Sequence, residues 1–377
     1  MVKKLWASLH GDNWIKLCII LLMVMSALIV FSSTSPLSYK NTHDTSHMFY
    51  SHIGKMVLSL GALWVFSRIT VRITIKCVDV LYYISLALLL VVKFYSAEVN
   101  GASRWIDLGF ITFQPSEFAK VVLMLFLAKH LSSPEKNVLR TIVLYMLPVT
   151  LIFLENGSTG ILLIASGLFI VLLSGVFKFR YVCLAGVGLV LLFVVVAYLE
   201  LFPRLSTWTG RISRFVSGAA DIQADYSMIA VASGGLGGVG LGNSDMKNFL
   251  PLSFADYIFA IVLEETGAVG LILTLVAYCL MFKRIRDYAM MSERKFESYA
   301  LLGLGGMYTF QAIMHMFVNV GLFPVTGQTL PLVSWGGTSG IFVCIAYGTI
   351  LSITHDIQQS KKQVTNSKTT KTKEPCE

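Results

Sequence analysis

Long apolar runs separated by short polar segments dominate this sequence and leave very few folds open to it. Ten runs have the character of membrane-crossing helices: 15–33, 51–69, 77–95, 118–133, 141–155, 158–177, 181–202, 256–282, 299–320 and 331–353. A transmembrane helix needs about 20 predominantly apolar residues. Charged residues make up only 14% of the chain, against about 25% in a typical soluble domain. The sequence therefore predicts an all-α polytopic membrane protein with about ten transmembrane helices.

The distribution of basic residues predicts the orientation of the chain. If the N-terminus is cytoplasmic, most of the 30 lysines and arginines fall on the cytoplasmic side, including those of 283–295 and of the C-terminal tail. This is the positive-inside bias, and it predicts that both termini are cytoplasmic. The formal net charge of +9 then reports orientation, and no nucleic-acid partner is expected. The six cysteines contain no C-x-x-C spacing, so neither a zinc site nor a disulfide framework is expected.

Two long segments are expected on the outer side of the membrane. The first covers about 96–117, and the second is the outer loop 203–255 between the seventh and eighth helices. Long loops in compact proteins are usually functional or disordered, and the apolar and glycine content of the second favours order. The chain thus divides into a transmembrane domain over 1–355 and a cytoplasmic tail over 356–377. The tail is rich in Lys, Thr and Ser and is predicted to be disordered.

Three acids accompany the eighth apolar run. Asp256 lies where the outer loop ends and the run begins, and Glu264 and Glu265 follow inside the run. At the usual helical rise these two lie about 12 Å deeper than Asp256. A carboxylate inside a membrane helix costs about 2.5 kcal/mol or more, so such residues usually face a wet cavity or a partner. An acid at the membrane boundary beside a long outer loop indicates chemistry at the bilayer surface.

The first outer segment, NGASRWIDLGFITFQPSEFAK at 100–120, carries charged residues at two places. Pro115 is a favourable first residue of a helix, and Glu117 and Lys120 share one face of that helix, where they can pair. Either the pair only seats the helix, or it forms a charged wall of a cavity open to the outside. Arg104 beside Trp105 suits the headgroup zone, either to grip phosphate or as an interfacial anchor.

Two further stretches combine glycine with polar side chains. SGGLGGVGLGNS at 233–244 is neither a Walker A loop nor a dinucleotide fingerprint, and its glycines permit close backbone approach to a helix or a ligand. Upstream, Arg211 and Arg214 either hold a diphosphate or belong to a solvated face. GLFPVTGQTLPLVSWGGTSG at 321–340 breaks the path between the last two helices, and Ser334 there either serves tight packing or lines a wet cavity.

Together, these motifs resemble the SEDS family (shape, elongation, division and sporulation), which includes RodA, FtsW and SpoVE. The resemblance is carried by NGASRWIDLG…QPSEFAK, GGLGGVGLGNS, LP…ADYIFAIVLEETGAVG and FPVTGQTLPLVSWGGTS in this order, and it covers the chain apart from the tail. Within the family, the motifs GLGNS and PVTGQTLPLVS are more similar to the division member, FtsW, than to RodA.

The resemblance implies a SEDS-type fold and a peptidoglycan glycosyltransferase in the bacterial cytoplasmic membrane. Such an enzyme polymerises Lipid II into β-1,4 glycan strands on the outer face, here during cell division. The implied partners are a class B penicillin-binding protein, which is a single-span transpeptidase, and other proteins of the division machinery. The outer domains of this chain are too small to contain a transpeptidase.

The resemblance also assigns residues. Asp256 matches the acid that the family uses for catalysis, Glu117 and Lys120 match its polar cavity pair, and Gln223 and Ser227 fit its loop pattern. With the candidates above, the expected substrate-binding residues are Arg104, Glu117, Lys120, Arg211, Arg214, Gln223 and Ser334. Asp256 is also the expected ligand of a divalent cation, Mg²⁺ or Mn²⁺.

The chemistry fits these residues without the resemblance. A lipid diphosphate on the anomeric carbon of the donor is a good leaving group once its charge is neutralised. The acceptor is a sugar hydroxyl, which needs a base as it attacks, and a carboxylate at the boundary supplies that base. Arg, Lys or a divalent metal held between carboxylate and diphosphate neutralises the leaving oxygens. One essential carboxylate is therefore sufficient.

The chain departs from the family pattern at several positions. Asn156 stands where the family commonly has an acid, so either Glu155 beside it replaces that charge or the acid is dispensable. Around Asp256, Leu252 stands where Glu is frequent, and Ala255 and Tyr257 stand where Thr and Phe are usual.

Two other functions stay open from the sequence alone. One is a Lipid II flippase, which needs a polar path through the whole bilayer, to which Glu264 and Lys120 would contribute. The other is a non-catalytic scaffold of the division machinery. The acid at the outer boundary favours polymerisation, because a sugar that stands above the headgroups reacts there.

Overall fold

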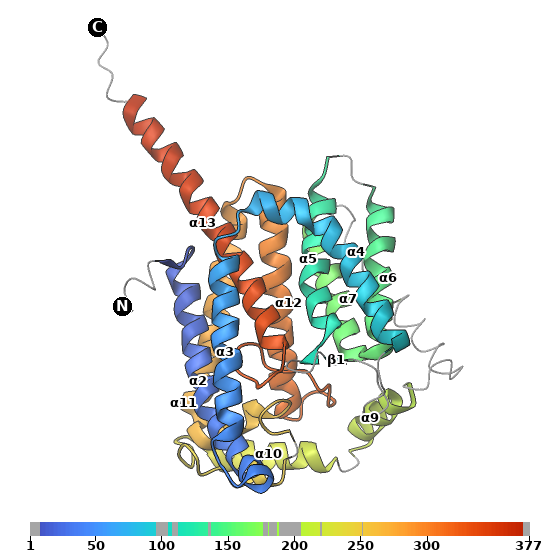
Figure 1. Cartoon of the computed structure of the whole chain (residues 1–377), viewed down its shortest axis with the longest axis vertical. Helices are drawn as coiled ribbons and strands as arrows, with labels where there is room; N and C mark the ends of the chain where they lie inside the picture. Colours follow the sequence, from blue (N-terminus) through green and yellow to red (C-terminus); the bar gives the residue numbers. More distant parts are fainter. Residues whose placement is uncertain are drawn as a thin grey trace.

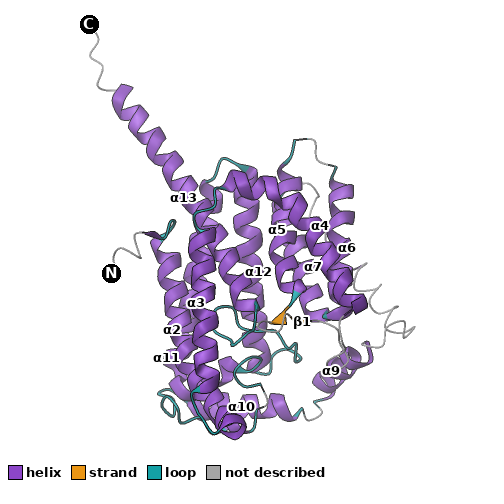
Figure 2. Ribbon diagram, in the orientation of Figure 1, coloured by secondary structure: helices purple, strands orange, loops and turns teal. Residues whose placement is uncertain are grey.

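The fold is an all-helical bundle in a computed structural model that describes residues 8–95, 105–107, 112–134, 137–175, 180, 187, 205–218, 221–250 and 252–371. Its helices are α2 (Asn13–Thr42), α3 (His47–Phe66), α4 (Val71–Tyr95), α5 (Pro115–Ser132), α6 (Val138–Glu155), α7 (Gly157–Leu173), α9 (Leu205–Ser217), α10 (Ile222–Gly234), α11 (Ile258–Met291), α12 (Lys295–Asn319) and α13 (Ser339–Lys371). A short hairpin of β1 (Ile106–Asp107) and β2 (Thr112–Phe113) precedes α5, and a 3-10 turn, η1 (Met246–Asn248), precedes α11 (Figure 2).

Nine of the ten predicted spans coincide with helices. The remaining one, the seventh span at 181–202, lies outside the described residues apart from one position. Seven of the described helices are long and apolar enough to cross a membrane: α2, α3, α4, α6, α11, α12 and α13. The apolar helix α7 is shorter, and α5 carries Glu117, Lys120 and Lys129. The prediction of an all-α polytopic membrane protein is confirmed.

The helices run roughly alongside one another, with both chain termini at one end of the bundle (Figure 1). We call the opposite end the distal end; α9 and α10 lie across it. Helix α5 lies at the centre, where it packs against α4, α6, α7 and α12 and is buried along most of its length. The helix that carries Glu117 and Lys120 is therefore enclosed by other helices, which is the usual position of charged side chains in a membrane protein.

Helix α13 differs from the sequence-based expectation at its C-terminal end. It continues from the bundle to Lys371, so that most of the tail over 356–377, which was expected to be disordered, is helical (Figure 1). Extending an existing helix adds one hydrogen bond per residue without a new nucleation step, whereas starting one is unfavourable. The polar composition of the tail did not predict that α13 continues into it from the bundle.

Helix α11 is interrupted near its start. Gly267 has φ 60° and ψ −145°, which is not helical, so the chain forms a short segment over 258–266 and a long one over 268–291. The backbone N–H groups of Val239 and Gly240 donate to the carbonyls of Glu264 (2.9 Å) and Glu265 (3.1 Å). The glycine-rich stretch thus satisfies carbonyls that the kink takes out of the helical ladder, which is why close backbone approach is needed there.

Glu264 and Glu265, which precede the kink, are both engaged by other segments of the chain. Both belong to the short segment, which packs against α10 at the distal end. The Glu264 carboxylate accepts from the Ser244 hydroxyl and from the backbone N–H groups of Asp245 and Met246. The Glu265 carboxylate accepts from the hydroxyl of Ser32 in α2. Glu264 therefore anchors the outer loop, and Glu265 connects the short segment of α11 to α2.

Candidate active site

Asp256 lies in the turn that precedes α11, and three consecutive carbonyls of this turn are held by other segments. Trp335 N–H donates to the Phe254 carbonyl at 2.9 Å, and the Ser334 hydroxyl donates to the Ala255 carbonyl at 2.7 Å. The side-chain amide of Asn319 donates to the carbonyl of Asp256 itself at 3.2 Å. Because all three bonds come from the end of α12 and from the chain after it, the position of Asp256 is set by those segments.

The segment between α12 and α13, over 320–338, folds back among the helices; we call it the re-entrant loop. His315 and Gln311 of α12 hold it through the carbonyls of Gln328 (2.7 Å) and Thr329 (2.9 Å). The Gln328 amide donates to the hydroxyls at the start of α7, Ser158 and Thr159, both at 2.9 Å. Buried irregular backbone must have its polar groups satisfied in this way, so the loop is part of the core.

The re-entrant loop also meets the Asp256 carboxylate. A Cβ at Gly327 would stand 3.8 Å from Asp256 Oδ2, so the loop backbone passes close beside the acid. Arg211 of α9 donates to the carbonyl of Val325, two residues earlier in the loop, at 3.1 Å. Of the two predicted arginines of the outer loop, Arg211 therefore contacts the segment that borders Asp256.

The pKa of Tyr257, the residue after Asp256, is affected by the charged groups around the acid. Its side chain is buried, and burial raises the pKa of its phenol well above the ordinary value. The carboxylates of Asp221 and Asp256 raise the pKa of Tyr257 further, whereas the guanidinium of Arg211 lowers it. Two carboxylates and one guanidinium thus act on the same buried hydroxyl, which stays protonated beside the candidate catalytic residue.

Glu117 and Lys120 form the ion pair that their spacing predicted. The Lys120 Nζ lies 2.8 Å from Glu117 Oε1, and both side chains are buried in the bundle. Lys120 also donates to the side chain of Gln311 at 3.2 Å and lies over the Tyr308 ring, 5.9 Å from its centroid. Since Gln311 in turn holds Thr329, the pair is connected to the re-entrant loop through a single side chain.

The remaining predicted residues are distributed differently. Arg104 lies outside the described residues. Arg214 is exposed, and its Nε donates to the Gly210 carbonyl in its own helix at 3.3 Å. Gln223 is half-buried in the first turn of α10. The Ser334 hydroxyl accepts from Leu330 N–H at 2.8 Å while it donates to Ala255, so it ties the re-entrant loop to the Asp256 turn.

The two positions that depart from the family pattern lie at the junction of α6 and α7. Glu155 is the last residue of α6, and Asn156 follows it as the only residue between the two helices. The Asn156 side-chain oxygen is 2.8 Å from the Ser158 hydroxyl, which also lies within reach of the Thr326 carbonyl and the Gln328 amide. The residue in place of the usual acid therefore helps to seat the re-entrant loop.

Several residues of the site were missed by the sequence analysis, although a signal was present. Gln311, His315 and Asn319 follow one another at intervals of four in an otherwise apolar run, which places three polar side chains on one helix face. All three are buried and bind the re-entrant loop or the Asp256 turn. Ser227 belongs to the same network, since its hydroxyl donates to the Asn319 carbonyl at 2.8 Å.

A divalent cation fits this site only if the substrate supplies some of its ligands. Among the described residues, no group of three or more His, Cys, Asp or Glu side chains is placed to hold a metal. Mg²⁺ is usually bound through one or two carboxylates together with water and substrate phosphates, not by a cage of protein ligands. The half-buried carboxylate of Asp256 meets that requirement, provided that the substrate brings the phosphates.

Curated proteins that resemble this chain carry closely related names. It is 32% identical to a probable peptidoglycan glycosyltransferase FtsW from Coxiella burnetii, over 95% of this chain and 100% of that one. It is also 32% identical to the peptidoglycan glycosyltransferase MrdB from Escherichia coli K12, over 95% of this chain and 98% of that one. The equal identities do not separate the two branches that these names represent.

Solved structures give the same result. A chain of a peptidoglycan synthase complex, described as coordinating polymerization and crosslinking, matches with a TM-score of 0.76 and 26% identity, over 93% of this chain and 99% of that chain. The rod shape determining protein RodA from Thermus thermophilus matches with a TM-score of 0.68 and 25% identity, over 92% of this chain and 97% of that chain. The model of the FtsW, RodA and SpoVE family, described as cell cycle protein, matches residues 12–359. The chain therefore belongs to the FtsW/RodA/SpoVE family of integral membrane proteins.

Proposed function

We propose that this peptidoglycan glycosyltransferase polymerises Lipid II into β-1,4 glycan at the distal end of the bundle, with Asp256 as the catalytic base. The observation that carries the proposal is the clamp on three consecutive carbonyls that presents Asp256 beside the re-entrant loop. A general base must be held in position to take a proton during attack, and it contributes about 10²–10⁴-fold to the rate.

The reaction exchanges one bond at the anomeric carbon of the donor for another. The acceptor hydroxyl attacks this carbon, its proton passes to the Asp256 carboxylate, and a new C–O bond forms. The bond from the same carbon to the lipid diphosphate breaks, and its electron pair leaves with the diphosphate oxygen. Arg211, which lies on the same side of the site, provides positive charge for that oxygen.

A divalent cation, Mg²⁺ or Mn²⁺, would be held by Asp256 together with the diphosphate. When bound, it neutralises charge on the leaving group. The Glu117–Lys120 pair is connected to the re-entrant loop by hydrogen bonds from Lys120 to Gln311 and from Gln311 to the Thr329 carbonyl. We assign this pair to keeping the loop in position, and we leave substrate contact to residues that border Asp256.

The hydrogen bonds of the Glu264 carboxylate favour polymerisation over a flippase function. A flippase needs a polar path through the membrane, to which Glu264 was a candidate contributor. Its carboxylate is buried and accepts hydrogen bonds from Ser244, Asp245 and Met246 of the outer loop. A carboxylate bound in this way anchors a loop and does not line a path. The names of the relatives, which specify a glycosyltransferase, agree with this assignment.

The cellular setting follows from the sequence and from one relative. The GLGNS and PVTGQTLPLVS wording supports a role in division, and the bias of basic residues supports cytoplasmic termini, which places the distal end outside the cytoplasm. The solved synthase complex combines polymerization with crosslinking, which supports a class B penicillin-binding protein as partner.

The direct test uses purified protein in lipid nanodiscs. Lipid II is added with Mg²⁺, with Mn²⁺ or with a chelator, with and without a candidate transpeptidase partner, and the glycan products are separated on a gel. We expect polymer in the presence of a divalent cation and none with the chelator. Labelled Lipid II that crosses into the inner leaflet of vesicles without forming polymer would establish the flippase instead.

A further inference from the structure

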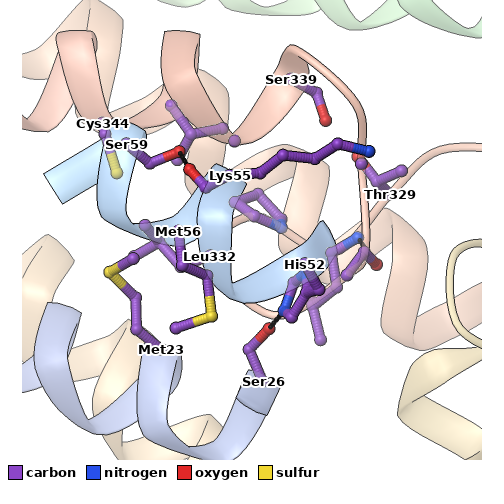
Figure 3. Close-up of a pocket in the computed structure, with 16 residues that line it drawn as sticks. Met23, Ser26, His52, Lys55, Met56, Ser59, Thr329, Leu332, Ser339 and Cys344 are labelled. Carbon is purple, nitrogen blue, oxygen red and sulfur yellow. Dashed lines mark hydrogen bonds between the residues drawn. The ribbon is translucent and has the colours of Figure 1, made fainter. Parts of the chain in front are cut away.

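The re-entrant loop also forms part of the wall of a pocket. The pocket is enclosed by α2, α3, the loop residues 329–336 and the start of α13 (Figure 3). Two regions distant in sequence, α2 with α3 and the re-entrant loop with the start of α13, thus converge on one cavity. Neither the sequence motifs nor the proposed reaction uses the side chains that α2 and α3 contribute to it.

Lys55 of α3 is the charged residue of this pocket. Its side chain is partly buried and extends towards Ser339 and Thr329 (Figure 3). Among the described residues no carboxylate forms an ion pair with Lys55, and its Nζ lies over the ring of Trp335, 5.0 Å from the centroid. An ammonium group within a membrane helix and without a carboxylate partner is costly, which marks it as a site for an anion.

The walls of the pocket are fixed by hydrogen bonds. Ser26 of α2 donates to the Val333 carbonyl of the re-entrant loop at 2.6 Å, and its oxygen lies 3.0 Å from His52 Nε2. A hydroxyl has one proton, and a carbonyl can only accept. Therefore Ser26 gives its proton to Val333 and accepts from the N–H at Nε2 of His52. This arrangement joins α2, α3 and the loop around the cavity before any ligand binds.

One residue connects the pocket to the candidate active site. Ser334 lines the cavity, and its hydroxyl donates to the carbonyl of Ala255, the residue before Asp256. The same stretch of loop therefore forms a wall of the pocket and holds the catalytic turn. A group bound beside Lys55 would contact the segment that positions the acid.

We propose that Lys55, together with the hydroxyls of Ser339 and Thr329, forms a subsite for a phosphate or diphosphate group carried by a lipid. This inference rests on the proposed function, since a lipid-linked diphosphate is its substrate and its product. Lysine binds phosphate as a point charge, and hydroxyl groups add neutral donors. The pocket lies between helices that cross the membrane, so a phosphate attached to a lipid is already at the right place.

The test measures binding, so its outcome does not depend on catalysis. The chain and the variants Lys55→Met, Lys55→Arg and Lys93→Met are placed in phosphatidylcholine nanodiscs. Lys93 is exposed in the last turn of α4 and does not line the pocket, so its substitution removes the same charge elsewhere. Undecaprenyl diphosphate is titrated in one arm and inorganic diphosphate in the other. Thermal unfolding is recorded for each protein.

We expect Lys55→Met to weaken binding of undecaprenyl diphosphate by about tenfold or more, as for loss of a charged hydrogen bond, with Lys55→Arg nearer to the parent. Its unfolding temperature should be equal or higher, because the substitution removes an unpaired charge. An equal loss in the inorganic arm would support an anion subsite that does not need the lipid. If Lys55→Met and the parent bind both ligands equally, or the parent binds neither, the proposal is wrong, whatever Asp256 variants do to polymerisation.

Discussion

Asn319 bridges the two sides of the catalytic turn, for its side-chain nitrogen donates to the Asp256 carbonyl at 3.2 Å and its oxygen accepts from Ala260 N–H at 3.0 Å. The first bond holds the acid, and the second gives the Ala260 N–H, which also donates to the Tyr257 carbonyl at 3.1 Å, a further acceptor at the start of α11. Since the Asn319 carbonyl also accepts from Ser227, the end of α12 joins α10 and α11 at one point.

This bridge predicts the effect of Asn319→Leu. The side chain is fully buried, so leucine of similar size leaves the Asp256 carbonyl without its donor, whereas the Ala260 N–H keeps the Tyr257 carbonyl as acceptor. We expect a loss of stability of about 1–3 kcal/mol per group left unsatisfied. Polymerisation should fall by about 10²-fold, because small displacements of a catalytic group are costly. Thermal unfolding and a Lipid II assay on the folded fraction measure the two effects separately. Parent-like activity in the folded protein would show that the bridge does not position Asp256.

Much of the fold was accessible from the sequence, because the membrane restricts it. Apolar run length predicts helices directly in a bilayer, and nine predicted spans are found as helices. Pro115 does begin α5, and the three-residue spacing of Glu117 and Lys120 does produce an ion pair. These are local features, decided by residues within a few positions of one another.

The features that could not be predicted from the sequence depend on contacts between distant segments of the chain. Nothing near Gly267 in the sequence shows that the helix breaks there, because the kink needs the glycine-rich loop to satisfy the carbonyls of Glu264 and Glu265. Likewise, spacing alone could not show that the Ser334 hydroxyl accepts from the Leu330 N–H and donates to the Ala255 carbonyl. Which partner a polar side chain meets is a property of the tertiary fold, not of its spacing.

The buried pair predicts a non-additive stability pattern. Glu117→Gln leaves Lys120 charged and without its carboxylate, and Lys120→Met leaves the carboxylate buried without its ammonium; each should cost about 3–5 kcal/mol. The double variant should recover much of this loss, though not all of it, because Gln311 also loses the Lys120 donor. Thermal unfolding of the four proteins completes a double-mutant cycle. Effects of the two substitutions that simply add would mean that the pair does not contribute as a unit.

The glycine-rich loop predicts a contrast between two adjacent positions. Gly238 has φ +75°, and a Cβ there would stand 2.2 Å from the Glu265 carbonyl oxygen, whereas nothing lies within 4 Å of a Cβ at Gly237. Gly238→Ala should therefore displace the loop from α11 and destabilise the fold by more than about 1 kcal/mol. Gly237→Ala should stay within about 0.5 kcal/mol of the parent. Hydrogen exchange at Val239 and Gly240 reports loop release, and equal exchange in both variants would contradict this role.

The decisive variant is Asp256→Asn, because it keeps the shape of the side chain and removes its charge. An alternative role for Asp256, capping the helix that follows, is not supported, since the N-cap position of α11 is Tyr257. Asparagine would in any case cap about as well as aspartate. We expect polymerisation to fall by at least about 10²-fold, the lower end of a general-base contribution, with unchanged unfolding temperature.

Asp245→Asn is the matched control for this variant. Asp245 is an exposed acid of the same outer loop, and it contacts Glu264 through its backbone N–H, which the substitution retains. The control should polymerise Lipid II like the parent, so that a loss confined to Asp256→Asn is due to one carboxylate and not to the charge of the loop. A folded Asp256→Asn protein that makes glycan at the control's rate would remove Asp256 from the mechanism. The next carboxylate to test as the base would then be Asp221, which also acts on Tyr257.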